Sequence, residues 1–114
     1  MDVREQTIEW ATVPDIADAL GVEVTKVRQH LREGKLLATR REDGPLTIPA
    51  AFVQDGAIVK GLPGVITLLR DARYGDEEAI GWLFTDDDLP GSPIQALREN
   101  RGTEVKRRAQ ALGF

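Results

Sequence analysis

The chain has 114 residues, of which 41% are hydrophobic and 30% charged, with a formal net charge of −4, no cysteine and one histidine. This size suits one compact domain or two small subdomains, and this composition can bury a core. The lack of cysteine excludes disulfides, thiolate metal sites and cysteine nucleophiles, and the lone His30 excludes a histidine-based metal cluster. No apolar run approaches the roughly 20 residues that span a bilayer, and MDVREQTIEW lacks the apolar segment of a secretory signal, so we expect a cytoplasmic protein without membrane contact.

A helix is predicted over TVPDIADALG. Thr12 can act as its N-cap, Pro14 suits its first turn, and Gly21 can end it in the left-handed conformation. Residues 1–11 show little periodicity, so we expect a short lead-in whose Trp10 docks on this first helix.

A second helix is predicted after only a few residues, because Val24, Val27 and Leu31 recur at spacings of three and four. The small Ala17 of the first helix suits the closest crossing of the two, and Gly34 ends the second helix. Two short helices joined by a glycine-containing turn are typical of a helix-turn-helix.

A hairpin is predicted directly after the second helix. Two strand-like runs, LLATR and LTIP, flank EDGP, and Asp-Gly between such runs favours a tight turn. A hairpin in this position is the wing of a winged helix-turn-helix. A further turn is predicted at QDG, residues 54–56.

The second half of the chain is predicted to be helical, in the runs PGVITLLRDARYG, DEEAIGWLF, SPIQALREN and TEVKRRAQAL, with a polar loop at TDDDLPGSP. Ser92 is expected to cap the third of these helices, and Thr103 with nearby acids to form a capping box on the last. The predicted fold is mainly α with a small β-hairpin wing: a winged helix-turn-helix over residues 1–60, then a small C-terminal helical bundle over residues 61–114.

Basic residues concentrate in the segment 24–41, which holds six of the 15 basic residues but only one, Glu33, of the 19 acidic residues. This segment carries a net charge of +5, and the rest of the chain carries −9. A charged helix face is often only a solvated face, but its place in a helix-turn-helix with a wing favours double-stranded DNA as the partner. The predicted DNA-contacting residues are Thr25, Lys26, Arg28, Gln29 and Arg32 of the second helix, Lys35 after it, and Arg40 and Arg41 of the wing.

The run VPDIADALGVEVTKVRQHLREGKLLATRREDG resembles the winged helix-turn-helix of excisionase-like and MerR-type regulators, through its Ile-Ala pair, Leu-Gly turn, Thr-x-Val and REGKL. Over residues 10–114 the chain is similar to a small actinobacterial DNA-binding protein family, whose members carry phrases like IVKGLPG and WLF in a short helical C-terminal domain. The resemblance implies DNA binding by the second helix and the wing, in a transcriptional regulator or nucleoid-associated protein.

The C-terminal half also resembles the toxin-binding domain of certain antitoxins, although TDDD departs from their shorter proline-bearing loop. Two interpretations stay open: its helices bind a partner protein or a second copy of the chain, or they only complete the core. The first makes a protein-interaction module the alternative function. The residues that carry this resemblance are Trp82, Leu83, Gly91, Ser92, Pro93, Leu97, Val105 and Leu112.

We expect no enzymatic activity, no cofactor and no metal site. The acidic runs at 76–78 and 86–88 are explained by complementation of a helix N-terminus and by a solvated loop. GLPG lacks the lysine and Ser/Thr of a phosphate-binding loop. The operator sequence, the regulated genes, the direction of regulation and the oligomeric state are not encoded in any recognisable pattern.

Overall fold

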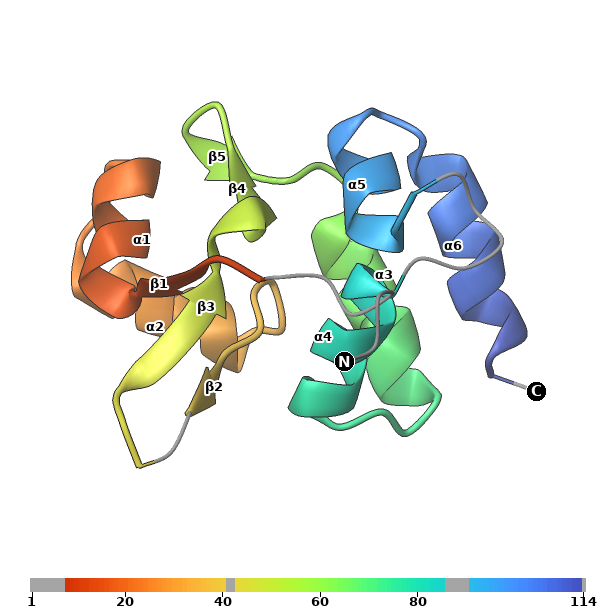
Figure 1. The fold of residues 1–114 in the computed structure, drawn as a ribbon, viewed down its shortest axis with the longest axis horizontal. Coiled ribbons are helices and arrows are strands. Elements are labelled where there is room, and N and C mark those ends of the chain that lie inside the picture. The colour runs from red at the N-terminus through yellow and green to blue at the C-terminus, as the bar shows by residue number, and fades with distance from the viewer. Residues whose placement is uncertain (1–7, 41–42, 86–90, 114) are drawn as a thin grey trace.

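The computed structural model describes residues 8–40, 43–85 and 91–113. Figure 1 shows an N-terminal half, in which two helices lie against a small sheet, beside a C-terminal half whose described elements are all helices. This architecture confirms the predicted mainly-α fold with a wing and a helical C-terminal region. The predicted wing residue Arg41 and most of the predicted loop before Ser92 lie outside the described residues.

The first two helices form as the sequence predicts. Helix α1 spans Val13–Leu20, and the Thr12 side chain accepts a hydrogen bond from the Asp15 N–H at 3.2 Å while Asp15 accepts from the Thr12 N–H at 3.4 Å. Gly21 ends α1 in the left-handed conformation, with φ of 70°. Helix α2 spans Val24–Arg32 and packs on α1 through a fully buried Val27.

The wing belongs to a three-stranded antiparallel sheet of order β1-β3-β2, with β1 at Trp10–Thr12, β2 at Thr39–Arg40 and β3 at Leu46–Pro49. Thr39 pairs with Thr47 and Arg40 with Leu46, which confirms the predicted hairpin. Strand β2 is shorter than the predicted run LLATR, because Leu36 and Leu37 turn into the core instead of extending the strand.

Strand β1 was not predicted, and the expected position of Trp10 is wrong. Trp10 pairs with Pro49 of β3 and lines a cavity with Ile80 of helix α4 (Asp76–Phe84), so it faces the C-terminal half instead of α1. A three-residue strand is too short to show an alternating pattern, and it forms only because β3 offers a free edge to it.

A second hairpin links the two halves. After a short 3-10 helix η1 at Ala50–Phe52, strand β4 (Val53–Gln54) pairs with β5 (Ala57–Ile58). The turn residues Asp55 and Gly56 both have positive φ, 54° and 78°, as a two-residue hairpin turn of the primed type requires. The predicted turn at QDG is thereby confirmed.

Four helices form the C-terminal half: α3 at Leu62–Asp71, α4 at Asp76–Phe84, α5 at Pro93–Arg98 and α6 at Gly102–Ala111. The Ser92 hydroxyl accepts a hydrogen bond from the Gln95 N–H at 3.3 Å, which confirms the predicted cap of α5.

The predicted capping box at Thr103 is wrong. Helix α6 already begins at Gly102, its N-cap is Arg101, and no side chain caps it. A box on Thr103 would also need Glu or Gln three residues later, where the chain has Lys106, and the nearby Glu104 accepts from the Arg101 guanidinium at 3.3 Å. Thr103 therefore lies inside the first turn of the helix.

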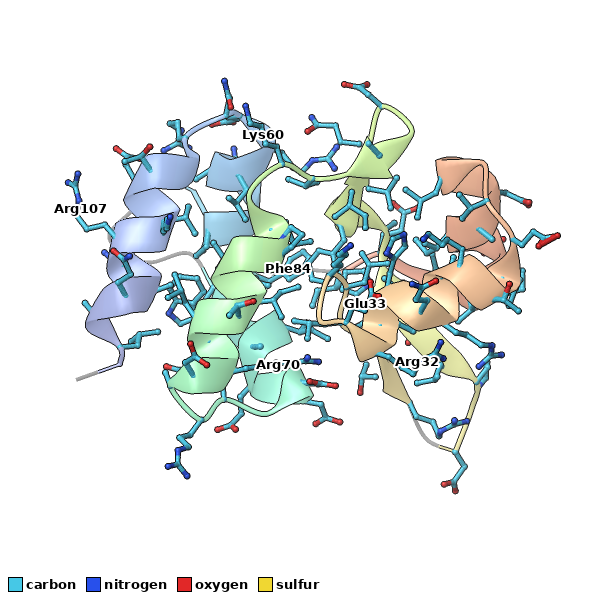
Figure 2. The ribbon with its side chains drawn as sticks, turned by 180° about the vertical axis from the view of Figure 1, so that it is seen from behind. Arg32, Glu33, Lys60, Arg70, Phe84 and Arg107 are labelled. Atoms are coloured by element: carbon cyan, nitrogen blue, oxygen red, sulfur yellow. The ribbon has the colours of Figure 1, made fainter. Side chains whose placement is uncertain are left out.

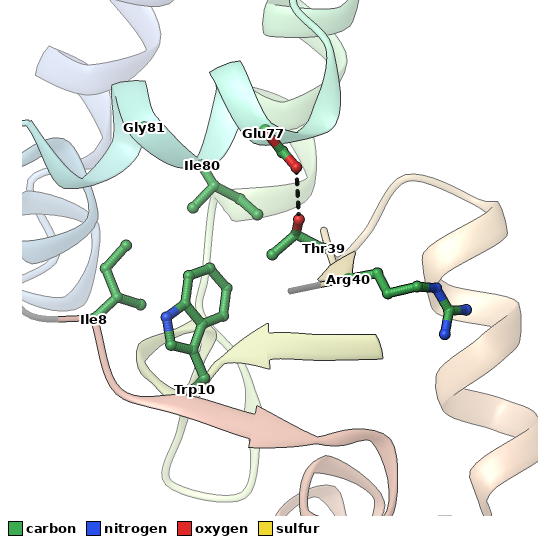
Figure 3. A pocket seen from close by; sticks show the side chains of 7 residues that line it. All are labelled: Ile8, Trp10, Thr39, Arg40, Glu77, Ile80 and Gly81. Carbon is green, nitrogen blue, oxygen red and sulfur yellow. Dashed lines mark hydrogen bonds between the residues drawn. The ribbon is translucent and has the colours of Figure 1, made fainter. Parts of the chain in front are cut away.

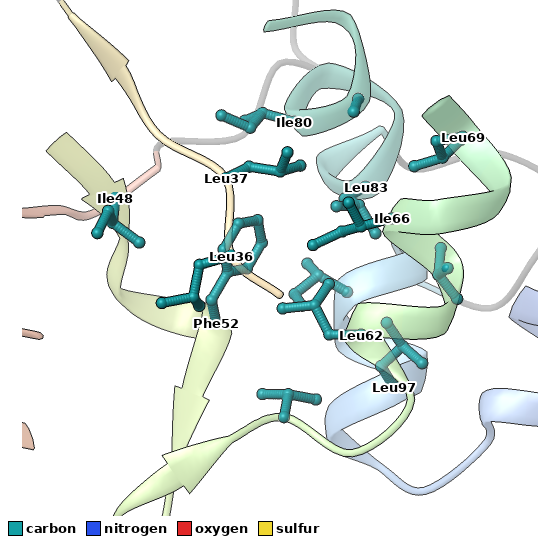
Figure 4. Close-up of a cluster of buried hydrophobic side chains, with 14 of the residues drawn as sticks. Leu36, Leu37, Ile48, Phe52, Leu62, Ile66, Leu69, Ile80, Leu83 and Leu97 are labelled. Carbon is teal, nitrogen blue, oxygen red and sulfur yellow. The ribbon is translucent and has the colours of Figure 1, made fainter. Parts of the chain in front are cut away.

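One hydrophobic core runs through both halves (Figure 4). Leu36, Leu37 and Phe52 contribute to it from the N-terminal half, and all three are at most 1% exposed. The rings of Phe52 and Phe84 lie 6.0 Å apart between centroids and join the winged part to α4. From the C-terminal half the fully buried large side chains are Leu62, Val65, Ile66, Leu69 and Leu83.

A polar contact reinforces this junction. Nη1 of Arg98, at the end of α5, donates hydrogen bonds to the carbonyl oxygens of Ala51 and Val53 at 2.8 and 3.0 Å. Ala51 lies in η1 and Val53 is the first residue of β4, so the contact joins α5 to the start of the second hairpin. The guanidinium thus satisfies backbone groups that have little access to water.

We expect thermal unfolding of the chain to show one transition, because neither half closes a core of its own. Calorimetry checks this by comparing the calorimetric enthalpy with the van't Hoff enthalpy, which agree for an all-or-none transition. Two well-separated transitions would contradict the shared core.

We expect Arg98→Ala to lower the free energy of unfolding by about 2 to 3 kcal/mol, because two part-buried carbonyl groups lose a charged donor. Urea denaturation followed by circular dichroism measures the change. Arg107→Ala, on an exposed position of α6, is the matched control and should change stability by less than about 0.5 kcal/mol. Equal stability of the two variants would show that the Arg98 contacts add nothing.

Candidate nucleic-acid interface

Helix α2 presents a polar face to solvent on the side opposite Val27. Thr25, Lys26, Arg28 and Arg32 are exposed, and Gln29 is half-buried. Figure 2 looks onto this side of the molecule, where α2 runs across the front of the winged half. The described residues that the sequence assigns to the second helix therefore share one surface, as the helical spacing predicts.

One of these side chains, Gln29, and the following Lys35 are engaged with Glu33, the C-cap residue of α2. Gln29 donates from Nε2 to Glu33 at 2.9 Å, and Lys35 lies 3.4 Å from the other carboxylate oxygen. The hydrogen bond from Gln29, followed by Lys35, lowers the pKa of the Glu33 carboxyl below its ordinary value. Glu33 is therefore ionised at neutral pH and offsets part of the positive charge at this end of the helix.

His30 adds no charge to this surface. Burial, and then the positive charges of Lys26 and Lys35, lower the pKa of the imidazole below 6.5. Its Nδ1 atom is buried and has no hydrogen-bond partner among the described residues. At pH 7 the side chain is neutral, so the positive charge of α2 comes from lysine and arginine alone.

A cleft of about 230 Å³ lies between helix α2 and the wing. Arg28 of α2 and Arg40 of β2 both line it, together with Thr12, Val13, Pro14, Pro45 and Leu46. Arg40 is fixed in the wing by a hydrogen bond from Nη1 to the Gly44 carbonyl oxygen at 3.0 Å. Two arginines 12 residues apart in the sequence are thus brought to one cleft.

The other side of Arg40 borders a cavity of about 420 Å³ between the sheet and α4 (Figure 3). Trp10 and Ile80 form its apolar walls, and the Thr39 hydroxyl donates to the Glu77 carboxylate at 3.0 Å across it. This contact ties strand β2 to the C-terminal half. No local pattern could have revealed it, because Thr39 and Glu77 are 38 residues apart.

Within the described residues, no three histidine, aspartate or glutamate side chains gather into a group that could hold a metal ion. None of the described helices is long and apolar enough to cross a membrane.

Residues 1–53 match the winged helix-turn-helix domain of the DNA-binding protein Rv2175c, and residues 59–113 match the Rv2175c C-terminal domain, which is described as a domain of unknown function. The DNA-binding protein Rv2175c of Mycobacterium tuberculosis (strain ATCC 25618 / H37Rv) is 42% identical over 127 aligned residues, which cover 100% of this chain and 85% of that protein. The NMR structure of Rv2175c superposes with a TM-score of 0.83 at 40% identity, covering 100% of this chain and 87% of that one. Sequence and fold agree along the whole length, and the chain belongs to the family of the DNA-binding protein Rv2175c.

Proposed function

We propose that this protein binds double-stranded DNA, with α2 in the major groove and the wing on the backbone or in the minor groove. The observation that carries the proposal is the cleft that Arg28 and Arg40 line together, since it places one cation of the helix opposite one of the wing. Such a cleft suits the sugar-phosphate backbone between the two grooves. The mycobacterial relative is a DNA-binding protein, which supports the same conclusion.

The proposed contacts divide into two kinds. Arg28, Gln29 and Arg32 on α2 are suited to base edges, because arginine pairs with guanine and glutamine with adenine. Gln29 must first leave Glu33, so a base that it reads has to replace that hydrogen bond. The remaining proposed residues act on phosphates or on groove width: Thr25, Lys26, Lys35, Arg40 and Arg41.

The charge distribution supports binding that depends strongly on salt. The segment 24–41 carries +5 in a chain of net charge −4. If about five phosphates are neutralised, log K should fall with log salt at a slope of roughly −4 to −5.

We assign the DNA-binding role to residues 1–60, and infer a cytoplasmic transcriptional regulator or nucleoid-associated protein. Genome-wide recovery of bound DNA tests the choice, since a regulator enriches few sites and a nucleoid protein many. A homodimer through the C-terminal helices is the arrangement that would raise affinity, and sedimentation analysis tests it.

The antitoxin-like interpretation of residues 61–114 receives less support from the packing. Leu83, Leu97 and Val105, which carry that resemblance, are at most 3% exposed in the core of the chain itself. Side chains buried in this way are not available to a partner protein, so their role as core residues explains the pattern.

Arg28→Ala combined with Arg32→Ala should weaken binding to a preferred duplex at least tenfold and reduce the preference between sequences, because both residues are exposed on the proposed recognition face. The free energy of unfolding should change by less than about 1 kcal/mol, since neither side chain is in the core. Fluorescence anisotropy on preferred and random duplexes measures the effect. Unchanged affinity for both duplexes would refute the assignment of α2 as the recognition helix.

The wing should behave differently. Arg40→Ala combined with Arg41→Ala should weaken binding to all duplexes by a similar factor, because both residues are proposed to act without reading bases. The slope of log K against log salt should become flatter by about one to two units. Salt titrations of the variant on the same two duplexes test this. A variant that loses sequence discrimination while keeping its salt slope would show that the roles of wing and helix are reversed.

A further inference from the structure

Arg70 is a residue of the C-terminal half that reaches the end of α2. It lies in the last turn of α3, and its Nη1 atom would be 2.7 Å from a Cβ atom placed on Gly34. The guanidinium therefore rests on the backbone of the turn that follows α2, in space that any larger residue at position 34 would fill. Figure 2 shows Arg70 and Arg32 on the same side of the molecule, with α3 beside α2.

The ion pair that Arg70 makes leaves it available to an anion. Its Nη2 atom lies 3.5 Å from Asp76, and the two side chains are 38% and 53% exposed. An exposed pair of this length is worth little, so a phosphate can replace or join the carboxylate at small cost. Two other arginines of this half are differently placed: Arg98 donates to part-buried carbonyl groups, and Arg101 is held between Glu99 and Glu104.

The neighbours of Arg70 at this end of α2 favour an anionic ligand. Arg32 and Lys35 are exposed there, and the acidic residue between them, Glu33, is engaged by Lys35 and Gln29. Arginine presents a planar set of donors that matches a phosphate group. The basic surface of the winged half therefore continues onto α3.

We propose that Arg70 contacts a DNA phosphate beside the end of α2, so that the C-terminal region forms part of the DNA interface. This inference deepens the proposed function and rests on it. The C-terminal region would then contact DNA as well as complete the core. The protein would contact one phosphate of the duplex in addition to those bound by α2 and the wing.

The test is a salt titration of DNA binding by the full chain, with Arg70→Ala, Arg70→Lys and the control Arg107→Ala. Arg107 also loses one exposed positive charge, but it lies on α6 at the end of the molecule remote from α2 (Figure 2). One lost phosphate contact should reduce the salt slope by about 0.9 and the affinity about eightfold at 0.1 M salt. Arg107→Ala should change neither, because charges beyond roughly 10 Å are screened at this salt.

Arg70→Lys should keep the salt slope, because the charge stays within reach of the phosphate. If Arg70→Ala fails to fold, Arg70→Gln decides, because it keeps side-chain donors over Gly34 but removes the charge: a slope reduced by about 0.9 supports the proposal, and an unchanged slope overturns it. If Arg70→Ala binds DNA more weakly but keeps the salt slope of the wild type, the proposal is also overturned, because Arg70 would then only position the turn at Gly34.

Failure of this inference can be told apart from failure of the proposed function. If Arg70→Ala binds like Arg107→Ala while the Arg28/Arg32 variant is weak, the phosphate contact is refuted and DNA binding by α2 stands. If the Arg28/Arg32 variant binds like the wild type, the proposed function fails, and this inference fails with it.

Discussion

The burial of Phe52 against Phe84 and the surrounding core is the contact on which the rest of the structure depends. The sheet of the winged half has strands of only two to four residues, and a hairpin of this size is marginal in water. Leu36 and Leu37 enter the core directly before β2, and Phe52 enters it shortly after β3. The base of the wing is thus anchored on both sides by residues of the core that the two halves share.

This anchoring sets the geometry of the proposed interface. Strand β2 carries Arg40 at its end, and its other residue, Thr39, bonds to Glu77 of α4. A change in the packing of α4 would therefore move Arg40 relative to Arg28 across their cleft. The C-terminal half contacts the winged half through the core, through the Thr39–Glu77 hydrogen bond and through Arg70 at the turn at Gly34. The C-terminal half therefore positions both α2 and the wing.

The structural features that could be predicted from the sequence are those that depend on residues close together in the chain. The Thr12–Asp15 cap, the Asp55-Gly56 turn and the spacing of Val24, Val27 and Leu31 each involve neighbours within a few residues, so their patterns are readable. The exposed basic face of α2 follows from the same periodicity. Contacts between distant residues leave no such pattern: β1 exists only because it pairs with β3. Arg70 and Glu77, which reach the DNA-facing half from 36 and 38 residues away, look like ordinary helix-surface residues in the sequence.

The net negative charge of the whole chain does not prevent the basic side chains of α2 and the wing from attracting a phosphate, because charges act only over short distances at physiological salt. At physiological salt the Debye length is about 8 Å, whereas the molecule extends 36 × 31 × 26 Å. Acidic side chains on a distant surface are therefore largely screened from a phosphate at α2, but Glu33, Asp76 and Glu77 are close enough to oppose it. Two of these three are paired with a basic side chain, and Glu77 accepts from Thr39. In the proposed interface, nearby acids that are already engaged repel DNA less than free ones, and acids on distant surfaces have little effect on a phosphate at α2. A duplex that contacts α2 and the wing together, as proposed, therefore meets mainly the +5 charge of the segment 24–41 and little of the −9 charge on the rest of the chain.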